Sequence, residues 1–339
     1  MRTMHSNSRR DFLKQALPGA ALLCVGGTME TLAAAEPAAA SAKSRVVVAR
    51  DEQLRGTGST VDPQRMLALA DRAMQALFGS AHPLVQIDAW RRLVRPGDTV
   101  SLKVNTLGGR GISTNVHLVA AICERLQEAG VKAGDILVWD RDSSEMERAG
   151  FHIVAGGDRV QCYGTDRVGY EQELSAWGSV GGCLSKILTR RTSVLINLPV
   201  LKDHDGAGVT IALKNMYGVI HNPNKYHPNG CNPYVADLNM LPEIRSRMRL
   251  TICDATTAMY EGGPGFKPEH SWNANALLVS TDPVALDYTG WKLIERKRAE
   301  KGLKTLKAEE REPSYIATAA DGDHRLGAND SKMISIVEV

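Results

Sequence analysis

A strand, a helix and a second strand follow one another within residues 98–139, and this pattern constrains the fold more than any other feature. Residues 98–104 and 136–139 are short strand-like segments, and apolar side chains recur at helical spacing over residues 116–129. The positions that share one helical face are Val116, Val119, Ala120, Cys123 and Leu126. A unit of this kind joins two parallel strands by a right-handed crossover, which predicts an α/β fold.

Other short apolar segments extend the predicted sheet. They lie at residues 46–49, 193–197, 250–253, 276–279 and, as an edge strand, 335–339. The glycine-rich residues 150–183 are ambiguous and leave room for a strand near 160–163 or a small insertion. Strands that are apolar throughout are typical of parallel sheets buried on both sides. We therefore expect α/β architecture, with a mostly parallel sheet covered by helices on both faces.

Two helix starts are marked by the same pair of residues. Asp62-Pro63 and Asp282-Pro283 each combine an N-cap carboxylate with proline at the first helical position. The two helices are expected to reach about Phe78 and Glu300. Residues 234–247 also look helical, although a proline interrupts the pattern.

The first residues carry the pattern of an export signal. Residues 8–14 read Ser-Arg-Arg-Asp-Phe-Leu-Lys, and the apolar stretch 16–27 that follows is too short to span a bilayer. Small residues at 33–35 or 40–42 offer cleavage sites. The pattern predicts a twin-arginine signal peptide over residues 1–35.

The predicted signal sets the expected organisation of the rest of the chain. Residues 36–44 are rich in Ala, Ser and Pro and predict a flexible lead-in, followed by one α/β domain over 45–339. We expect a periplasmic protein whose partners include the twin-arginine export machinery. No later run reaches 18 apolar residues, so stable membrane insertion is not expected.

Charge and cysteine usage narrow the functional classes. Residues 1–35 hold four of the 41 basic and two of the 38 acidic residues, so a nearly neutral balance of 37 to 36 remains. Such a balance does not supply the positive field that nucleic-acid binding needs. Without a C-x-x-C spacing, no bound iron–sulfur cluster is expected. Five cysteines follow the signal, and a disulfide between Cys162 and Cys183 is left open for an oxidising compartment.

Polar residues follow the predicted strands at the edge where their carboxyl ends meet, which is where open α/β sheets bind ligands. Lys103 and Asn105 end one strand and share a face because they are two residues apart. Asp140, the segment 197–205 and Asp254 follow three others. We expect these side chains to line one site.

The richest segment runs from Lys202 to Cys231. Lys202 and His204 precede a glycine turn, Gly206–Gly208, and a predicted helix over 209–217. Glycines before a helix leave backbone N–H groups free for an anion, and a nearby lysine adds a positive charge. The residues expected at this anion site are Gly206, Gly208, Thr210, Lys214 and Asn215. A solvated turn is the plainer alternative.

Metal binding at this segment is also left open. His204, His221, His227, Cys231 and His270 could supply ligands, but their spacing matches no standard zinc pattern. The nearby lysines favour an anionic ligand over a simple cation. In the loop after Asp254, Gly262 and Gly263 let the backbone pass close to a ligand, and Glu261 is a base, a metal ligand or a turn cap.

Three ordered blocks of sequence resemble one family. The first is Asn197-Leu-Pro-Val-Leu-Lys-Asp-His204, continued by Thr210, Leu213-Lys-Asn-Met-Tyr-Gly218 and His227. The others are Asp254-Ala-Thr-Thr-Ala-Met-Tyr-Glu-Gly-Gly-Pro264 and Ser280-Thr-Asp-Pro-Val-Ala-Leu-Asp287. Together they resemble the family catalogued as domain of unknown function 362, over roughly residues 98–295. Many relatives carry ferredoxin-like modules, which this sequence lacks. The resemblance implies a shared site but no reaction, at Lys202, His204, Lys214, Asn215, Asp254, Glu261 and Asp287.

Two functions follow from these residues. In the first, the chain is an exported enzyme that acts on a small anionic molecule, with or without a metal or redox cofactor. Its expected catalytic residues are His204, as general acid or base, with Lys202, Lys214, Asp254 and Glu261. Its expected ligand- or cofactor-binding residues are Lys103, Asn105, Gly206, Gly208, Thr210, Asn215, Gly262 and Gly263. In the second, a periplasmic binding protein sequesters a metal or an anionic metabolite.

Overall fold

The strands assemble into one large sheet in a computed structural model, which describes residues 43–79 and 86–339. The predicted signal peptide and its cleavage sites lie outside the described residues. Along the main path of the sheet the order is β13 (Ile334–Glu338), β1 (Ser44–Arg50), β12 (Ala276–Ser280), β10 (Met248–Met259), β7 (Val194–Asn197), β2 (Val100–Lys103), β3 (Ile136–Trp139) and β4 (Gln161–Cys162). The described residues belong to one compact unit.

Most neighbouring strands of this sheet run parallel. β10, β7, β2, β3 and β4 form an uninterrupted parallel series, with Val100 paired to Ile136 across the predicted crossover unit. Along this main path β12 is the exception, because it runs antiparallel to both β1 and β10. β13 adds a parallel edge strand beside β1, as predicted. These pairings confirm the predicted mostly parallel sheet.

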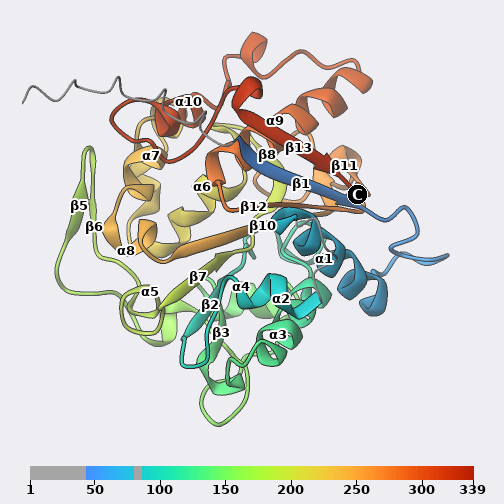
Figure 1. The fold of residues 1–339 in the computed structure, drawn as a ribbon. Helices are drawn as coiled ribbons and strands as arrows, with labels where there is room; N and C mark the ends of the chain where they lie inside the picture. The colour runs from blue at the N-terminus through green and yellow to red at the C-terminus, as the bar shows by residue number, and fades with distance from the viewer. Residues whose placement is uncertain (1–42, 80–85) are drawn as a thin grey trace, which may run out of the picture. The chain divides into compact units, whose positions relative to one another are not determined.

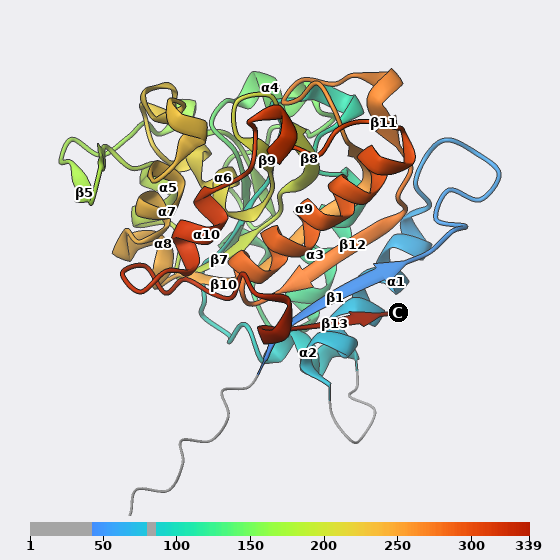
Figure 2. The ribbon, with the colours of Figure 1, turned by 90° about the horizontal axis from the view of Figure 1, so that it is seen from above.

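Helices cover both faces of the sheet because the strand residues alternate between two cores. Val138 packs into one core and Trp139 into the other. The first core is closed by α1 (Pro63–Phe78), α2 (Gln86–Arg91), α3 (Val116–Glu128) and α4 (Ser143–Arg148). The second is closed by α5 (Lys186–Arg190), α6 (Ala212–Asn215), α7 (Tyr234–Asn239), α8 (Pro242–Arg245), α9 (Pro283–Glu300) and α10 (Tyr315–Ala320). Figure 2 shows α9 and α1 on opposite sides of β12.

The two helix starts marked by Asp-Pro are confirmed. The carboxylate of Asp62 accepts from the backbone N–H of Arg65, and that of Asp282 accepts from Val284 and Ala285. The interrupted pattern at 234–247 is two helices, because Pro242 begins the second one.

The predicted helix over 209–217 is wrong in its first half. Gly208–Thr210 form β9, which pairs antiparallel with β8 (Val200–His204), and the helix begins only at Ala212. The glycine turn is therefore the turn of a hairpin and not the entrance of a helix. Within the ambiguous segment 150–183, β5 (Ser175–Trp177) and β6 (Val180–Gly182) form a separate two-stranded sheet.

The five cysteines of the described residues are free thiols. Cys162 and Cys183, for which a disulfide was left open, are not bonded to each other. Most of these thiols are buried, and burial raises the pKa of Cys123 and of Cys162 to about 12. Buried thiols of this kind pack as small apolar groups and stay protonated.

Candidate functional site

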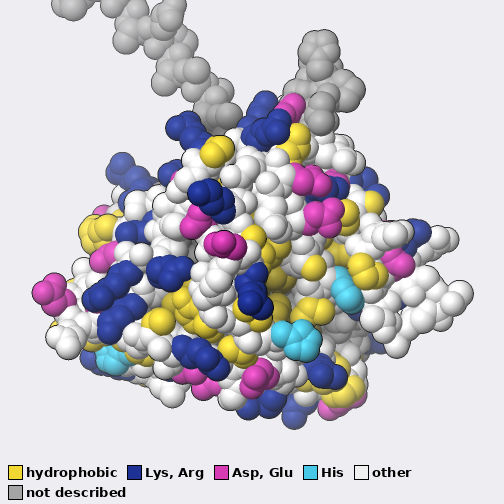
Figure 3. All heavy atoms as spheres, turned by 90° about the horizontal axis from the view of Figure 1, so that it is seen from below, with side chains coloured by type: hydrophobic (Ala, Val, Ile, Leu, Met, Phe, Trp, Pro, Cys, Tyr) yellow, Lys and Arg dark blue, Asp and Glu magenta, His cyan; other side chains and the backbone are white. Residues whose placement is uncertain are grey.

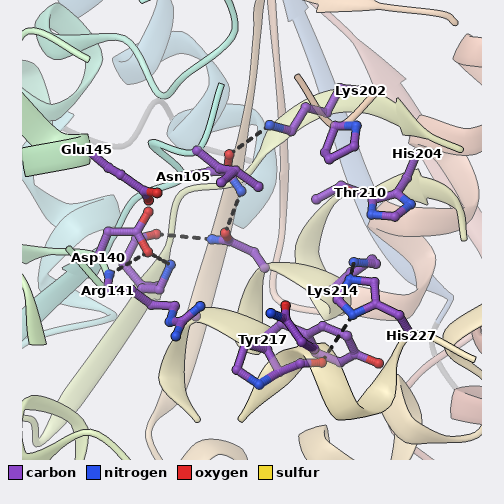
Figure 4. Close-up of a pocket in the computed structure, with 17 residues that line it drawn as sticks. Asn105, Asp140, Arg141, Glu145, Lys202, His204, Thr210, Lys214, Tyr217 and His227 are labelled. Atoms are coloured by element: carbon purple, nitrogen blue, oxygen red, sulfur yellow. Dashed lines mark hydrogen bonds and ion pairs between the residues drawn. The ribbon is translucent and has the colours of Figure 1, made fainter. Parts of the chain in front are cut away.

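A cavity of about 300 Å³ opens at the carboxyl ends of β2 and β3, beside the β8–β9 hairpin. Eight of the residues expected at the site line it: Lys103, Asn105, Asp140, Lys202, His204, Thr210, Lys214 and Asn215. His227, one of the candidate metal ligands, lines it as well. Figure 4 shows two walls, with Lys202, His204, Thr210, Lys214 and His227 on one and Asp140, Arg141 and Glu145 on the other.

The β8–β9 hairpin sorts its side chains by the period of two residues in a strand. Lys202 and His204 are two apart and both line the cavity, and Thr210 is the cross-strand partner of Lys202. Asp203, between them, binds Arg311 on the other side of the hairpin. The hairpin thus directs one ammonium group, one imidazole ring and one hydroxyl group into the cavity.

A chain of amide side chains holds Lys202 in place. The Lys202 Nζ donates to Asn105 Oδ1 at 3.0 Å, and Asn105 Nδ2 donates to Asn215 Oδ1 at 3.0 Å. Asn215 Nδ2 donates in turn to Asn197 Oδ1 at 2.7 Å, and Asn197 Nδ2 to the carbonyl of Ala212 at 2.9 Å. Every amide is therefore oriented by its neighbour, and the oxygen of Asn105 faces the lysine.

Lys103 has a carboxylate partner. Its Nζ donates to Asp140 Oδ1 at 2.8 Å, and the other oxygen of Asp140 accepts from the N–H and hydroxyl of Thr106. Both members of the pair are buried. Gly218 packs against this pair so closely that a Cβ there would lie 2.6 Å from the Lys103 Nζ. Lys103 and Asp140 thus form a neutralised wall of the cavity.

Lys214 contacts a ring nitrogen. Its Nζ lies 3.3 Å from His227 Nε2, while His227 Nδ1 lies 3.1 Å from the carbonyl oxygen of Pro223. Because a carbonyl only accepts, Nδ1 carries the proton and Nε2 is the acceptor for Lys214. The ring of Tyr217 lies 4.6 Å from the same Nζ and favours a cation there.

His204 has the opposite tautomer. Its Nδ1 accepts from the backbone N–H of Gly206 at 3.1 Å, so Nε2 carries the proton. Its ring stacks on that of His227 at 5.7 Å between centroids. Burial, and next the charge of Lys214, lower the pKa of His204 to about 3. His204 is therefore a neutral hydrogen-bond donor at physiological pH.

Two ammonium groups in this cavity lack a counter-charge. Lys202 is 0% exposed and Lys214 is 6% exposed, and neither has a carboxylate within ion-pair distance among the described residues. Burial lowers the pKa of each to about 8, so both are mostly charged at pH 7. Thr210 Oγ1, between them in sequence and buried, has no hydrogen-bond partner within residues 43–79 and 86–339. An anion would satisfy all three groups.

The opposite wall contributes Glu145 and Arg141. Burial, followed by the charges of Asp140 and Asp142, raises the pKa of Glu145. Arg141 extends toward Tyr170, whose hydroxyl lies 3.5 Å from its Nε. Sequence reasoning placed Arg141 at this edge of the sheet, beside Asp140, but missed Glu145 and Tyr217. Tyr217 could have been found, because it lies three residues after Lys214, on the same side of one helical turn.

The other residues expected at the site lie elsewhere. Asp254 is in the middle of β10, where its carboxylate accepts from the backbone N–H of Asn115 at 2.6 Å and of Thr256 at 2.8 Å. Asp287 accepts from the N–H groups of Ala212 and Leu213, so the start of α6 already holds a carboxylate of the protein itself. Neither Asp254 nor Asp287 lines the cavity.

Glu261 and the four glycines expected to bind the ligand also lie outside the cavity lining. Those glycines are Gly206, Gly208, Gly262 and Gly263. Gly208 has φ +76°, and a Cβ there would lie 2.2 Å from the carbonyl oxygen of Arg311. Gly263 donates its N–H to Asp203 Oδ1 at 2.9 Å. These glycines allow close packing of the loops around the hairpin.

Carboxylate oxygens of Asp203, Asp205 and Glu261 lie within 4.8 Å of one another, a spacing that a metal ion could bridge. Arg311 already binds this group, at 3.3 Å from Asp203 and 3.0 Å from Glu261, and Arg298 also pairs with Glu261. The guanidinium groups supply the positive charge that a metal would otherwise provide. The arrangement is that of a neutralised ion-pair cluster.

Residues 100–292, more than half of the chain, match the model of the family described as Domain of unknown function (DUF362). The chain belongs to this family. Every residue that lines the cavity falls within the DUF362 match.

Two curated relatives align with segments of different length in this chain. A thylakoid-associated protein of Synechocystis is 27% identical over 247 residues, which cover 70% of this chain and 75% of that protein. A UDP-N-acetylglucosamine 1-carboxyvinyltransferase of Paracoccus denitrificans is 30% identical over 137 residues. That alignment covers 38% of this chain and only 31% of the transferase.

Two solved structures match the chain with low TM-scores and low identity. The lactate racemase apoprotein of Thermoanaerobacterium thermosaccharolyticum superposes with a TM-score of 0.43 at 13% identity, over 75% of this chain and 57% of that protein. A Thermotoga maritima protein gives 0.39 at 7% identity, over 70% of this chain and 60% of that protein.

Surface charge and helix hydrophobicity concern contacts with other molecules and with membranes. Basic and acidic side chains are interspersed on the face shown in Figure 3. Within the described parts of the chain, no helix is both long and apolar enough to cross a bilayer.

Proposed function

We propose that this DUF362 chain is an exported enzyme that binds a small anionic molecule in the cavity between β2, β3 and the β8–β9 hairpin. The observation that carries the proposal is the pair of buried ammonium groups, Lys202 and Lys214, whose contacts are neutral. Burying a charge without a partner is costly, and a bound anion would offset that cost.

Each group of the cationic wall has a part in this proposal. Lys202, Lys214 and the unpartnered hydroxyl of Thr210 would hold the anion, and the Nε2–H of His204 would donate to a second ligand oxygen. The amide chain through Asn105 would keep Lys202 in position. His204 acts here as a donor, because its other nitrogen is engaged by Gly206.

The contact between Lys214 and His227 favours an enzyme over a binding protein. Holding an anion needs a cation, but it does not need a neighbouring imidazole that accepts a proton from that cation. The two groups at 3.3 Å form a pair across which a proton can move. A sequestering protein is the second candidate, and it predicts ligand binding without turnover.

Ligand-induced stabilisation tests the binding step. Thermal unfolding at pH 7 in the presence of acetate, succinate or inorganic phosphate should show stabilisation by at least one anion, by about 3 kcal/mol at 100 times its Kd. Lys202→Met and Lys214→Met should abolish this effect. Lys225→Met, which removes an exposed lysine of the same region, is the matched control. Equal stabilisation of all four proteins would place the anion elsewhere.

The export step is proposed from the sequence of residues 8–14. Replacing both Arg9 and Arg10 by Lys keeps the charge but removes the twin-arginine pattern. We expect the variant to remain in the cytoplasmic fraction, while the original chain is recovered from the periplasm. Equal recovery of both proteins from the periplasm would contradict this route.

A further inference from the structure

The three lysines of the cavity differ in the atom that each one contacts. Lys103 donates to a carboxylate at 2.8 Å, Lys202 to an amide oxygen at 3.0 Å, and Lys214 lies 3.3 Å from the unprotonated ring nitrogen of His227. Of these three acceptors, the imidazole nitrogen is the strongest base, although burial and the charge of Lys214 lower the pKa of His227. Lys214 is therefore the lysine that has a basic ring nitrogen within reach to accept its proton.

We propose that the ligand is a small oxo acid and that Lys214 forms an imine with its carbonyl carbon. This inference rests on the anion binding proposed above. The carboxylate of the oxo acid would lie against Lys202 and Thr210, and its carbonyl oxygen would face the Nε2–H of His204. A cavity of about 300 Å³ suits a molecule of a few carbon atoms.

The atoms and charges of imine formation balance with Lys214, His227 and the oxo acid alone. The Lys214 ammonium gives one proton to His227 Nε2, and the freed lone pair attacks the carbonyl carbon. The C=O electron pair moves to oxygen, which takes a proton from the attacking nitrogen to give a neutral carbinolamine. His227 returns its proton to the hydroxyl group, and the C–O bond breaks to release water. One ammonium and one carbonyl thus give one iminium ion and one water.

One further contact and the burial of Lys214 support the assignment to this residue. The ring of Tyr217, 4.6 Å from the Nζ, stabilises a cation, and both the starting ammonium and the iminium product are cations. Burial lowers the pKa of Lys214 to about 8, so the free amine is well populated in mildly alkaline buffer. Desolvation of this kind is a known way to activate a lysine nucleophile.

Reductive trapping tests the imine on the mature chain. The protein is incubated with pyruvate and sodium cyanoborohydride at pH 8, and the product is examined by intact mass and by peptide mapping. We expect one adduct per chain, located on Lys214. Lys214→Arg keeps the charge but should lose the adduct, whereas Lys225→Arg should keep it. His227→Gln should slow trapping at Lys214 by on the order of 10²-fold.

The outcomes separate this inference from the proposed function. Stabilisation by acetate with no adduct from pyruvate would overturn the imine and leave the anion site standing. Adducts spread over exposed lysines, with Lys214 unmodified, would likewise overturn the imine and leave the anion site standing. If no adduct forms and acetate, succinate and phosphate all fail to stabilise the protein, both the imine and the anion site are overturned.

Discussion

Replacing Lys202 by Met removes a buried ammonium and keeps a side chain of similar length. Burial lowers the pKa of Lys202 from 10.5 to about 8, which corresponds to about 3 kcal/mol at ~1.4 kcal/mol for each pH unit. The variant also loses the hydrogen bond to Asn105, at a cost of about 1 kcal/mol. Without ligand at pH 7, we therefore expect Lys202→Met to raise the free energy of unfolding by about 2 kcal/mol.

The effect of this substitution depends on pH in a direction that the pKa fixes. Below pH 8 the lysine is charged in both the folded and the unfolded chain, so the penalty is present in full. Between pH 8 and 10.5 the folded chain releases a proton that the unfolded chain retains, and the penalty is progressively relieved. By pH 9.5 about 2 kcal/mol should be relieved, so the advantage of the variant should disappear.

Urea unfolding at pH 7 and pH 9.5, followed by tryptophan fluorescence, measures both quantities. Comparing the two proteins at each pH cancels the contributions of titrating groups that they share and that Lys202 does not influence. Lys225→Met should change the free energy of unfolding by less than about 0.5 kcal/mol at either pH. A Lys202→Met variant that is less stable at pH 7, or whose effect is the same at both values, would show that the ammonium is already compensated inside the protein.

Three other predictions concern separate parts of the structure. His324 bonds to two carboxylates, which outweigh burial and raise its pKa, so its stabilising effect is full below pH 6.5 and is lost as pH rises through the folded pKa. His324→Gln should cost on the order of 1–2 kcal/mol at pH 5.5 and less at pH 8.5 in urea unfolding, and a larger loss at pH 8.5 would refute this. Cys183 is the half-buried thiol among the described cysteines, so Ellman's reagent should label one thiol rapidly in a Cys24→Ser protein, and none rapidly once Cys183 is also Ser. Gly218→Ala would place a Cβ 2.6 Å from the Lys103 Nζ and should cost about 1–3 kcal/mol in urea; unchanged stability would show that the pair can move aside.

The general architecture was predictable because it depends on local patterns. The crossover unit between residues 98 and 139 and the capped helix starts at Asp62 and Asp282 are set by nearby residues, and the structure confirms them. The pairing of β8 with β9 was not predictable in the same way. The run after Gly208 suits a helix as well as a strand, and only the partner strand decides between them.

The candidate site was predictable where strands end and not where they continue. Lys103 and Lys202 were found because they lie at or near the carboxyl ends of parallel strands, where side chains converge. Asp254 was misplaced because β10 continues to Met259, which puts this carboxylate in mid-strand. Glu145 was missed because α4 has only six residues, too few for a helical period to stand out.

A purely structural role for the buried lysines is the main alternative to a ligand site, and Lys103 provides the comparison within the same cavity. Its ammonium is as buried as that of Lys202, yet it is matched by a carboxylate at 2.8 Å. The fold can therefore place an acid beside a buried lysine at this edge of the sheet. Among these three lysines, it does so for Lys103 alone. Lys202 and Lys214 contact an amide oxygen and an imidazole instead, and neither of these groups carries a negative charge. Because unpaired buried charges destabilise a protein, these two ammonium groups support the proposal that a ligand supplies the missing negative charge.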